Sequence, residues 1–140
     1  MCVEMSWDGY IDHIIGGTEG ACDQACIIGL NGGGAWTSES HTAALKISQQ
    51  EGSTIATALS NEDCTSFQTK GILVGGMKYQ FLRTDPEEGT VLGKMKDHGA
   101  ITIQKTNSAI VIGHTAEGKV HGNTNKGVLN VVNYLKGLNM

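Results

Sequence analysis

The chain has 140 residues, of which 39% are hydrophobic and 17% are charged, a size and composition typical of one globular domain. Its apolar runs are far shorter than the roughly 20 residues of a membrane span, and no basic and then apolar stretch at the N-terminus indicates a secretory signal. We therefore expect a short tail at residues 1–5 and one soluble, cytoplasmic domain over residues 6–140.

The charges are divided unevenly along the sequence, although the net charge is only −4. Residues 1–69 hold one base and nine acids (1 − 9 = −8), whereas residues 70–140 hold nine bases and five acids (9 − 5 = +4). This second half could attract an acidic protein, a phosphoinositide headgroup or nucleic acid, or its charges could form an ordinary solvated face. The cations that could converge are Lys78, Arg83, Lys94, Lys96, Lys105, Lys119 and Lys126.

The four cysteines indicate neither a disulfide framework nor a metal site. Cys22 and Cys26 are four residues apart, which is not the spacing of a redox or zinc motif, and no histidine pair lies near them. Cys2 falls in the tail, and Cys64 stands alone. A chain of this size does not need disulfides to fold. We expect reduced thiols, no metal and no cofactor, as in a cytosolic protein.

The first predicted element is a helix over residues 6–15. Ser6 is a suitable N-cap, Asp8 would lie in the first turn, and Gly16-Gly17 would end the helix. Its apolar stripe consists of Trp7, Tyr10, Ile11 and Ile14. A helix this short is marginal by itself and must pack on the rest of the domain. Its two aromatic rings are either core anchors or partly open to solvent.

The middle of the chain predicts both strands and helices. An apolar run at residues 25–30 ends in Asn31-Gly32-Gly33-Gly34, which predicts a buried strand and a turn, and residues 35–37 resume as a strand. Between residues 40 and 59, apolar residues on both sides of Gly52 predict two short helices.

From residue 65 onward the pattern changes to short strands separated by turn residues. Gly75-Gly76 and Asn107 tolerate the positive φ of tight hairpins, and residues 85–89 form a further turn with the only proline. Strands joined so tightly must run antiparallel. The expected strands are residues 66–69, 71–74, 77–84, 91–96, 100–106 and 109–114.

The last predicted element is a helix over residues 123–140. Its core face is formed by residues at three- and four-residue spacing, namely Val128, Val131, Val132, Leu135 and Leu138. Lys126, Asn130 and Tyr134 are spaced by four and form a second face. The chain is therefore an α+β protein with an antiparallel sheet and a helix at each end of the sequence.

Signatures of enzymes are missing from the sequence. There is no G-x-S-x-G elbow, no phosphate-binding loop with its lysine and no H-E-x-x-H motif. The five histidines are scattered at His13, His41, His98, His114 and His121. A pair of Cys64 with a distant histidine is an arrangement that any chain of this composition offers. We expect no catalytic residues.

Aromatic residues make up only 5% of the chain, so their positions are informative. Trp7 and Tyr10 open the first helix, Trp36 follows the glycine turn, and Tyr134 lies outside the core face of the last helix. If the terminal helices pack side by side, these four rings can form a shelf for a polyproline II ligand, whose carbonyls accept hydrogen bonds from indole N–H and phenol O–H groups. Four independent core aromatics are the alternative.

Four segments resemble the profilin family, in particular its animal, invertebrate branch. They are M-S-W-D-G-Y-I-D at residues 5–12, A-C-I-I-G-L with A-W at residues 25–36, K-Y-Q-F-L-R at residues 78–83 and V-H-G-N-T-N-K-G at residues 120–127. The W-x-x-Y-I-D opening and the H-G-x-x-N-K start of the last helix stand at the two ends of one short domain. The similarity extends in order over residues 5–140.

This resemblance implies a central antiparallel sheet of five to seven strands, with the N- and C-terminal helices on one face and short helices on the other. It implies an adaptor, not an enzyme, that binds monomeric actin and proline-rich assembly factors, speeds nucleotide exchange on actin and regulates filament assembly in the cytoskeleton. Phosphoinositide headgroups are a further expected ligand, and a headgroup-binding module without actin affinity is the alternative. We expect a monomer that binds no nucleic acid.

The resemblance also assigns residues to two surfaces. The polyproline shelf maps to Trp7, Tyr10, Trp36, Tyr134 and Met140. Many vertebrate members have histidine in place of Tyr134 and end in tyrosine where this chain has Met140, so we expect one ring fewer at that end of the shelf. The actin surface maps to Lys78, Gln80, Arg83, Lys94, Lys96, Val120, His121, Gly122, Asn125, Lys126, Leu129 and Asn130.

Overall fold

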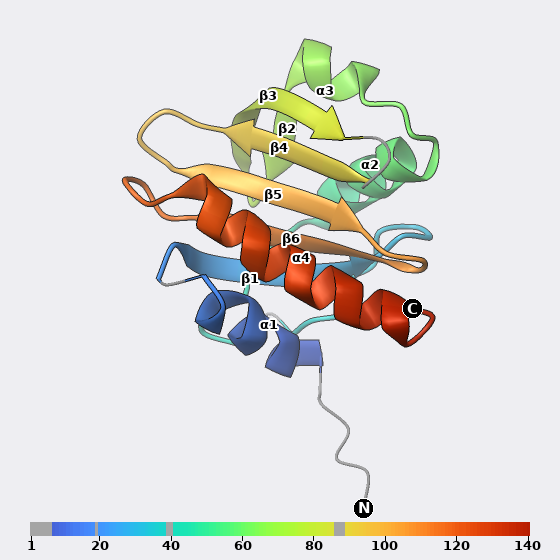
Figure 1. Cartoon of the computed structure of the whole chain (residues 1–140). Coiled ribbons are helices and arrows are strands. Elements are labelled where there is room, and N and C mark those ends of the chain that lie inside the picture. The colour runs from blue at the N-terminus through green and yellow to red at the C-terminus, as the bar shows by residue number, and fades with distance from the viewer. Residues whose placement is uncertain (1–6, 19, 39–40, 86–88) are drawn as a thin grey trace, which may run out of the picture.

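The computed structural model describes residues 7–18, 20–38, 41–85 and 89–140. Within these ranges the elements are, in chain order, α1 (Trp7–Gly16), β1 (Cys22–Gly29), α2 (Gln49–Ser60), α3 (Thr65–Lys70), β2 (Ile72–Val74), β3 (Met77–Asp85), β4 (Thr90–Lys94), β5 (Ala100–Lys105), β6 (Ala109–Thr115) and α4 (His121–Gly137) (Figure 1). The predicted N-cap Ser6 and the central residues of the predicted proline turn lie outside the described residues.

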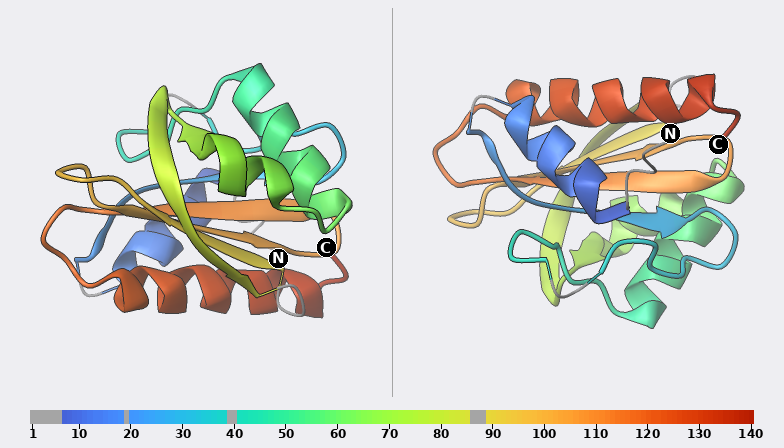
Figure 2. Two further views of the ribbon diagram at one scale, coloured as in Figure 1. Left: turned by 90° about the horizontal axis from the view of Figure 1, so that it is seen from above. Right: turned by 90° about the horizontal axis from the view of Figure 1, so that it is seen from below.

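One six-stranded sheet in the order β1-β6-β5-β4-β3-β2 forms the centre of the fold. Every neighbouring pair is antiparallel, as the tight turns between β2 and β6 predict. The first strand joins the sheet beside the last one, with Ile27 opposite Val111. Helices α1 and α4 cover one face, and α2 and α3 cover the other (Figure 2). The predicted α+β architecture of five to seven strands is therefore confirmed.

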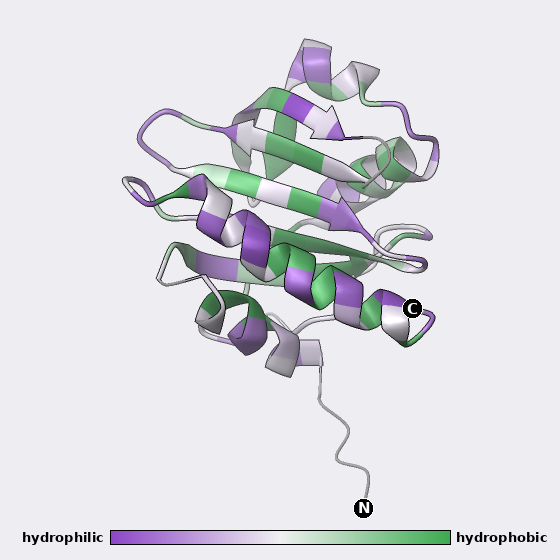
Figure 3. Cartoon of the chain, viewed as in Figure 1, coloured by the Kyte–Doolittle hydropathy of each residue, from purple (hydrophilic) through white to green (hydrophobic). Residues whose placement is uncertain are grey.

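Two hydrophobic clusters lie on the two faces of the sheet. One contains Ile101 and Ile103 with residues of α2 and α3, whereas the other packs Val111 against α1 and α4. Strand β6 is covered on both faces, so its residues from Ala109 to Ile112 are all buried. Figure 3 shows this apolar strand beside α4, in which hydrophobic and polar residues alternate. The sheet therefore holds the two terminal helices as one layer.

The segment predicted as a strand at residues 66–69 is instead the short helix α3. Asp63 Oδ1 accepts hydrogen bonds from the Thr65 N–H at 3.0 Å and from the Thr65 hydroxyl at 2.6 Å. These bonds satisfy a donor at the start of the helix and lower the pKa of Asp63 below its ordinary value. Phe67 then anchors α3 in the core. The hydrogen bonds of Asp63 just before the helix and the burial of Phe67 thus favour a helix in this segment.

The two helices predicted between residues 40 and 59 are in fact one. Ser48 and Glu51 form a capping box that starts α2, which then continues through Gly52. A Cβ at Gly52 would collide with the carbonyl oxygen of Gly33, so glycine permits a close backbone contact here and does not end the helix. The prediction mistook a packing glycine for a helix break.

The other predicted helix of this region is absent from the described residues, where residues 41–43 form a turn and Ala44 makes a bridge to Ala25 of β1. The Ala25 N–H donates to the Ala43 carbonyl at 3.0 Å, and the Leu45 N–H donates to the Ala25 carbonyl at 2.9 Å. The strand predicted at residues 35–37 is likewise reduced to one bridge, between Ile28 and Ala35. Both segments form hydrogen bonds with the outer edge of β1. The local sequence of these segments does not predict this pairing.

The last helix ends earlier than predicted. Helix α4 stops at Gly137, so Leu138, predicted as a core residue, is its C-cap and is 48% exposed. Val128, Val131, Val132 and Leu135 are buried, as predicted. None of the described helices is long and apolar enough to cross a membrane.

Candidate functional site

Four aromatic rings from three parts of the chain form a continuous row. The ring centroids of Trp36 and Trp7 are 4.7 Å apart, those of Trp7 and Tyr10 are 5.3 Å apart, and those of Tyr10 and Tyr134 are 6.0 Å apart. Each distance is typical of aromatic rings in contact. The structure therefore brings together the four rings of the predicted shelf, which we call the aromatic row.

The rings of the aromatic row differ in exposure. Tyr10 is only 7% exposed and belongs to the core, whereas Trp7 and Trp36 are partly buried and Tyr134 is 54% exposed. Burial, and then the neighbouring Tyr134, raise the pKa of Tyr10. Both readings of the first helix thus apply: Tyr10 is a core anchor, and Trp7 is partly open.

A cleft of about 570 Å³ adjoins the row between α1 and α4. Its lining residues are Tyr10, Asp12, His13, Gly16, Gly17, Asn130, Val131 and Tyr134. Asn130, predicted at the edge of the actin surface, lies in this cleft. Asp12 and His13 are polar residues that the sequence reasoning did not assign to a site. Their positions five and six residues after Trp7 on a short helix were the available signal.

Met140 is held beside the row by the turn between β5 and β6. Its main-chain oxygen accepts hydrogen bonds from the Ser108 N–H at 2.7 Å, the Thr106 hydroxyl at 2.6 Å and the Ser108 hydroxyl at 2.9 Å. Its side chain packs, partly buried, against the same cluster as Trp7 and Trp36. All five predicted shelf residues therefore belong to one region.

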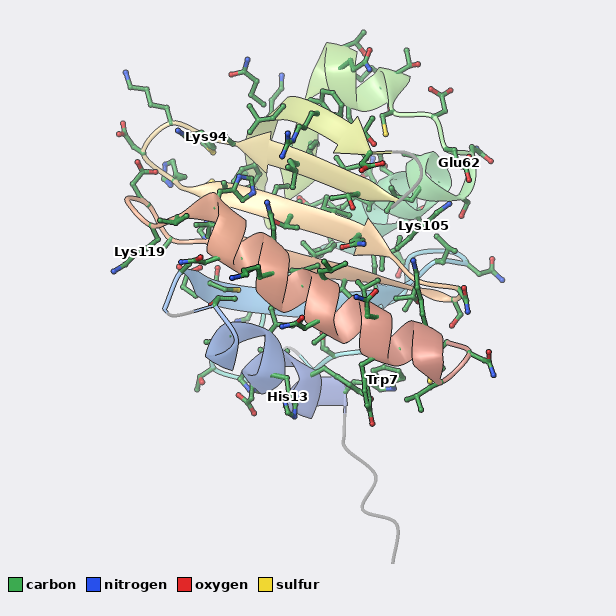
Figure 4. The ribbon with its side chains drawn as sticks, viewed as in Figure 1. Trp7, His13, Glu62, Lys94, Lys105 and Lys119 are labelled. Atoms are coloured by element: carbon green, nitrogen blue, oxygen red, sulfur yellow. The ribbon has the colours of Figure 1, made fainter. Side chains whose placement is uncertain are left out.

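A second surface lies beside α4, where β3 and β4 extend beyond the helix (Figure 1). Gln80 of β3 is opposite Lys94 of β4, and a cleft of about 460 Å³ brings Arg83 together with Asn125 and Leu129 of α4. We call this set, with His121 and Lys126, the strand–helix surface. Figure 4 shows Lys94 and Trp7 on opposite edges of the molecule. The two predicted sites are therefore separate.

His121 connects α4 to the sheet within the strand–helix surface. Its Nε2 lies 3.0 Å from the Ile101 carbonyl oxygen, which can only accept, so Nε2 carries the proton. Burial lowers the pKa of His121, the hydrogen bond to Ile101 opposes this, and the positive charges of Arg83 and Lys94 lower it further. The His121 ring is therefore close enough to Arg83 and Lys94 to be affected by their charges.

The lowered pKa of His121 predicts a pH-dependent stability. The unfolded chain binds a proton at this site more readily than the folded chain, so the free energy of unfolding should fall as the pH drops below about 6.5. Urea denaturation at about pH 7.5 and about pH 5 should show a smaller loss for His121→Gln than for the wild type. Equal losses in the two proteins would contradict this assignment.

The remaining predicted residues of the actin surface lie on exposed parts of the same side. Lys78 is in β3, Lys96 is in the turn after β4, and Val120, which is 62% exposed, caps α4. Gly122 and Lys126 are exposed within the first half of α4. Lys105 is different, because its ammonium group pairs with Glu62 of the opposite layer at 3.2 Å (Figure 4). It does not join the other cations, contrary to the expectation of one converging set.

Two residues of this surface were missed from the sequence. Thr102 and Gln104 are buried polar residues of β5 that line the same cleft, and the Thr102 hydroxyl donates to the Asn125 amide oxygen. They alternate with Ile101 and Ile103, so the period of two in A-I-T-I-Q-K was the signal.

The thiols of the described residues are free, as predicted. Cys22 and Cys26 are buried, and burial raises the pKa of Cys22 to about 11 and raises that of Cys26 as well. Cys2 lies outside the described residues. Within the described ranges, no three His, Cys, Asp or Glu side chains gather as metal ligands.

Comparison with known proteins identifies the scaffold. The sequence model of the Profilin family matches residues 5–140. The chain belongs to the profilin family. A profilin of Heliocidaris crassispina is 49% identical over 142 residues, a match that covers 97% of this chain and 100% of the relative. A profilin of Suberites domuncula is 48% identical over the same share of both chains. The predicted resemblance is therefore confirmed, including its invertebrate character.

The solved structures agree with this assignment. The structure of Acanthamoeba castellanii profilin II matches with a TM-score of 0.82 and 29% identity, covering 96% of this chain and 100% of that one. Mouse profilin IIa, solved in complex with a double repeat from the FH1 domain of mDia1, matches with a TM-score of 0.74 at 19% identity, covering 97% and 100%. The second match shows the shared fold alone.

Proposed function

We propose that this protein is an actin-monomer-binding adaptor that also binds proline-rich segments and so regulates filament assembly. The aromatic row would bind the proline-rich segment, and the strand–helix surface would bind actin. No covalent bond is made or broken in this function. Simultaneous occupancy would deliver actin to assembly factors in the cytoplasm, and biasing the opening of actin's cleft would speed its nucleotide exchange.

The observation that carries the proposal is the aromatic row itself. Three successive ring contacts of 4.7, 5.3 and 6.0 Å hold flat apolar faces beside each other on a profilin scaffold. A polyproline II segment is already extended, so it loses little conformational entropy when it lies along such a row. The FH1 repeat bound to mouse profilin IIa is an example of a proline-rich occupant in a protein of this fold.

The strand–helix surface supports the second half of the proposal through its charge. Arg83, Lys94 and Lys126 are exposed, and no acidic partner of these three side chains occurs among the ion pairs of the described residues. Such a field favours an acidic protein surface and accelerates its association. We propose phosphoinositide headgroups as further ligands of the same cations.

Binding of decaproline and of monomeric actin to the purified protein tests the proposal directly. Both ligands should be retained by a folded sample. Retention of phosphoinositide vesicles alone, without actin, would favour a headgroup-binding module instead. Retention of none of these ligands would contradict the proposed function.

Charge reversal at Lys126 should weaken actin binding selectively. Lys126→Glu places a carboxylate within the basic strand–helix surface, so the affinity for actin should fall about tenfold or more while decaproline binding stays within about twofold. Lys70→Glu is the matched control, because it makes the same change of charge on exposed α3 at the other face of the sheet. Equal losses of actin affinity in both variants would show a nonspecific charge effect.

A further inference from the structure

Helix α1 makes two polar contacts with the segment that follows Trp36. Asp8 Oδ1 accepts a hydrogen bond from the Ser38 N–H at 2.6 Å, and Asp12 Oδ1 lies 2.9 Å from His41 Nε2. The two carboxylates are four residues apart, so they project from the same side of the helix. Helix α1 therefore holds this segment at two points.

The orientation of the His41 ring is fixed by both of its nitrogens. The Ala43 N–H donates to Nδ1 at 2.9 Å, so Nδ1 is unprotonated and Nε2–H is the donor to Asp12. The His41 side chain is 17% exposed, whereas Asp12 is 72% exposed. The ring is thus a mostly buried link between the carboxylate of α1 and the backbone at Ala43.

The same segment is also fixed to β1. The Trp36 N–H donates to the Ile27 carbonyl at 2.9 Å, the Ile27 N–H donates to the Thr37 hydroxyl at 3.2 Å, and the Ala25 N–H donates to the Ala43 carbonyl at 3.0 Å. Because Trp36, Thr37 and Ala43 are hydrogen-bonded to β1, their positions are fixed by the sheet and not by α1. The contacts of Asp8 and Asp12 are two polar links that set the position of α1 relative to Trp36.

This arrangement bears directly on the aromatic row. Trp7 adjoins Asp8 on α1, and Trp36 lies two residues before Ser38, so the Asp8–Ser38 hydrogen bond lies directly after both indole rings in sequence. We infer that Asp8, Asp12 and His41 are positioning residues, which hold Trp36 against Trp7 and so preorganise the row for its ligand. The inference rests on the function proposed for the row and assigns these residues a role in its affinity.

The loss of preorganisation predicts how much decaproline affinity should fall when the Asp12–His41 contact is removed. Without the Asp12–His41 contact, Trp36 is held less firmly against Trp7, so the ligand must order these rings when it binds, which reduces affinity. Asp12→Ala and His41→Ala should each weaken decaproline binding about three- to tenfold. The double variant should bind no more weakly than either single variant, because both substitutions remove one shared contact.

The experiment measures decaproline affinity by titration of tryptophan fluorescence, together with the near-ultraviolet circular dichroism of the free proteins. Asp12→Asn keeps an oxygen acceptor for His41 and should restore affinity to within about twofold of the wild type. Asp23→Ala is the matched control, because it breaks another aspartate–histidine contact, Asp23 to His114 at 2.6 Å, away from the row. It should leave decaproline affinity unchanged, and actin affinity should be unchanged in Asp12→Ala.

The outcomes separate this inference from the proposed function. A wild type that does not bind decaproline would overturn the proposed function, and the role assigned to these three residues with it. A wild type that binds, with Asp12→Ala binding equally well and showing the same tryptophan dichroism, would overturn the positioning role alone. If Asp12→Ala and Asp12→Asn lose decaproline affinity equally, and Asp12→Ala also loses actin affinity, the effect is a general structural one. This result would also contradict the positioning role.

Discussion

Trp7→Ala should abolish most of the affinity for proline-rich ligands and leave actin binding intact. Trp7 contacts both Trp36 and Tyr10, so its removal breaks the aromatic row at its centre. Truncation of a central aromatic residue in a binding surface typically costs at least about 2 kcal/mol, which is about a 30-fold loss of affinity. Isothermal titration with decaproline measures this change.

Two further measurements show whether the loss is local. Trp7→Phe keeps a flat ring while removing the indole N–H, and should lose only part of the affinity. Actin affinity of Trp7→Ala should remain within about twofold of the wild type, because Trp7 lies far from Lys94 of the strand–helix surface (Figure 4). Loss of both activities in a folded Trp7→Ala protein would contradict the separation of the two surfaces.

Gly127→Ala should destabilise the fold strongly, although alanine normally favours a helix. A Cβ at Gly127 would lie 2.7 Å from the Ile14 carbonyl oxygen and closer still to the Thr18 methyl carbon. The backbone of α1 cannot move away without separating the two terminal helices. We expect the free energy of unfolding to fall by about 2–3 kcal/mol, as measured by urea denaturation.

Gly137→Ala is the matched control on the same helix. No atom lies within 4 Å of a Cβ at Gly137, so alanine there adds helix propensity without a collision. Its free energy of unfolding should be unchanged or higher by up to about 1 kcal/mol. Similar destabilisation by both substitutions would show that contact between α1 and α4 is not the cause.

Helix α4 acts as a strut between the two proposed surfaces. Asn125, in its first half, accepts a hydrogen bond from Thr102 of the sheet, and Tyr134, in its second half, contacts Tyr10 of α1. The buried stripe that includes Val128 and Leu135 fixes the helix between these two points. The second face predicted for this helix, formed by Lys126, Asn130 and Tyr134, therefore does not belong to one surface. Lys126 lies on the strand–helix surface, whereas Asn130 and Tyr134 line the cleft beside α1.

Regular periodicity was sufficient to predict most of the fold. The strands from β2 to β6 follow from short runs separated by turn residues, and the stripe of α4 follows from three- and four-residue spacing. The errors fell where a contact distant in sequence or a single cap decides the conformation. Gly52 is required by its close contact with Gly33, and Asp63 accepts hydrogen bonds from the first residue of α3, neither of which a periodic pattern reveals.

The candidate sites were predictable where residue type alone is distinctive. Scarce aromatic residues indicated Trp7, Trp36 and Tyr134, and the structure places their rings in one row. The residues that hold the row, such as Asp12 and His41, have common types and irregular spacing, so only the folded geometry reveals their contact. The same limitation applies to Lys105, whose pairing with Glu62 depends on the packing of α2.

The central claim is that two ligands bind this protein at once on separate surfaces. Its most direct test is the affinity of decaproline for the protein before and after saturation with monomeric actin, measured together with the mass of the complex by analytical ultracentrifugation. We predict affinities within about twofold of each other and a complex that contains all three components. Displacement of decaproline by actin, with no ternary complex at saturating concentrations of both ligands, would contradict the claim.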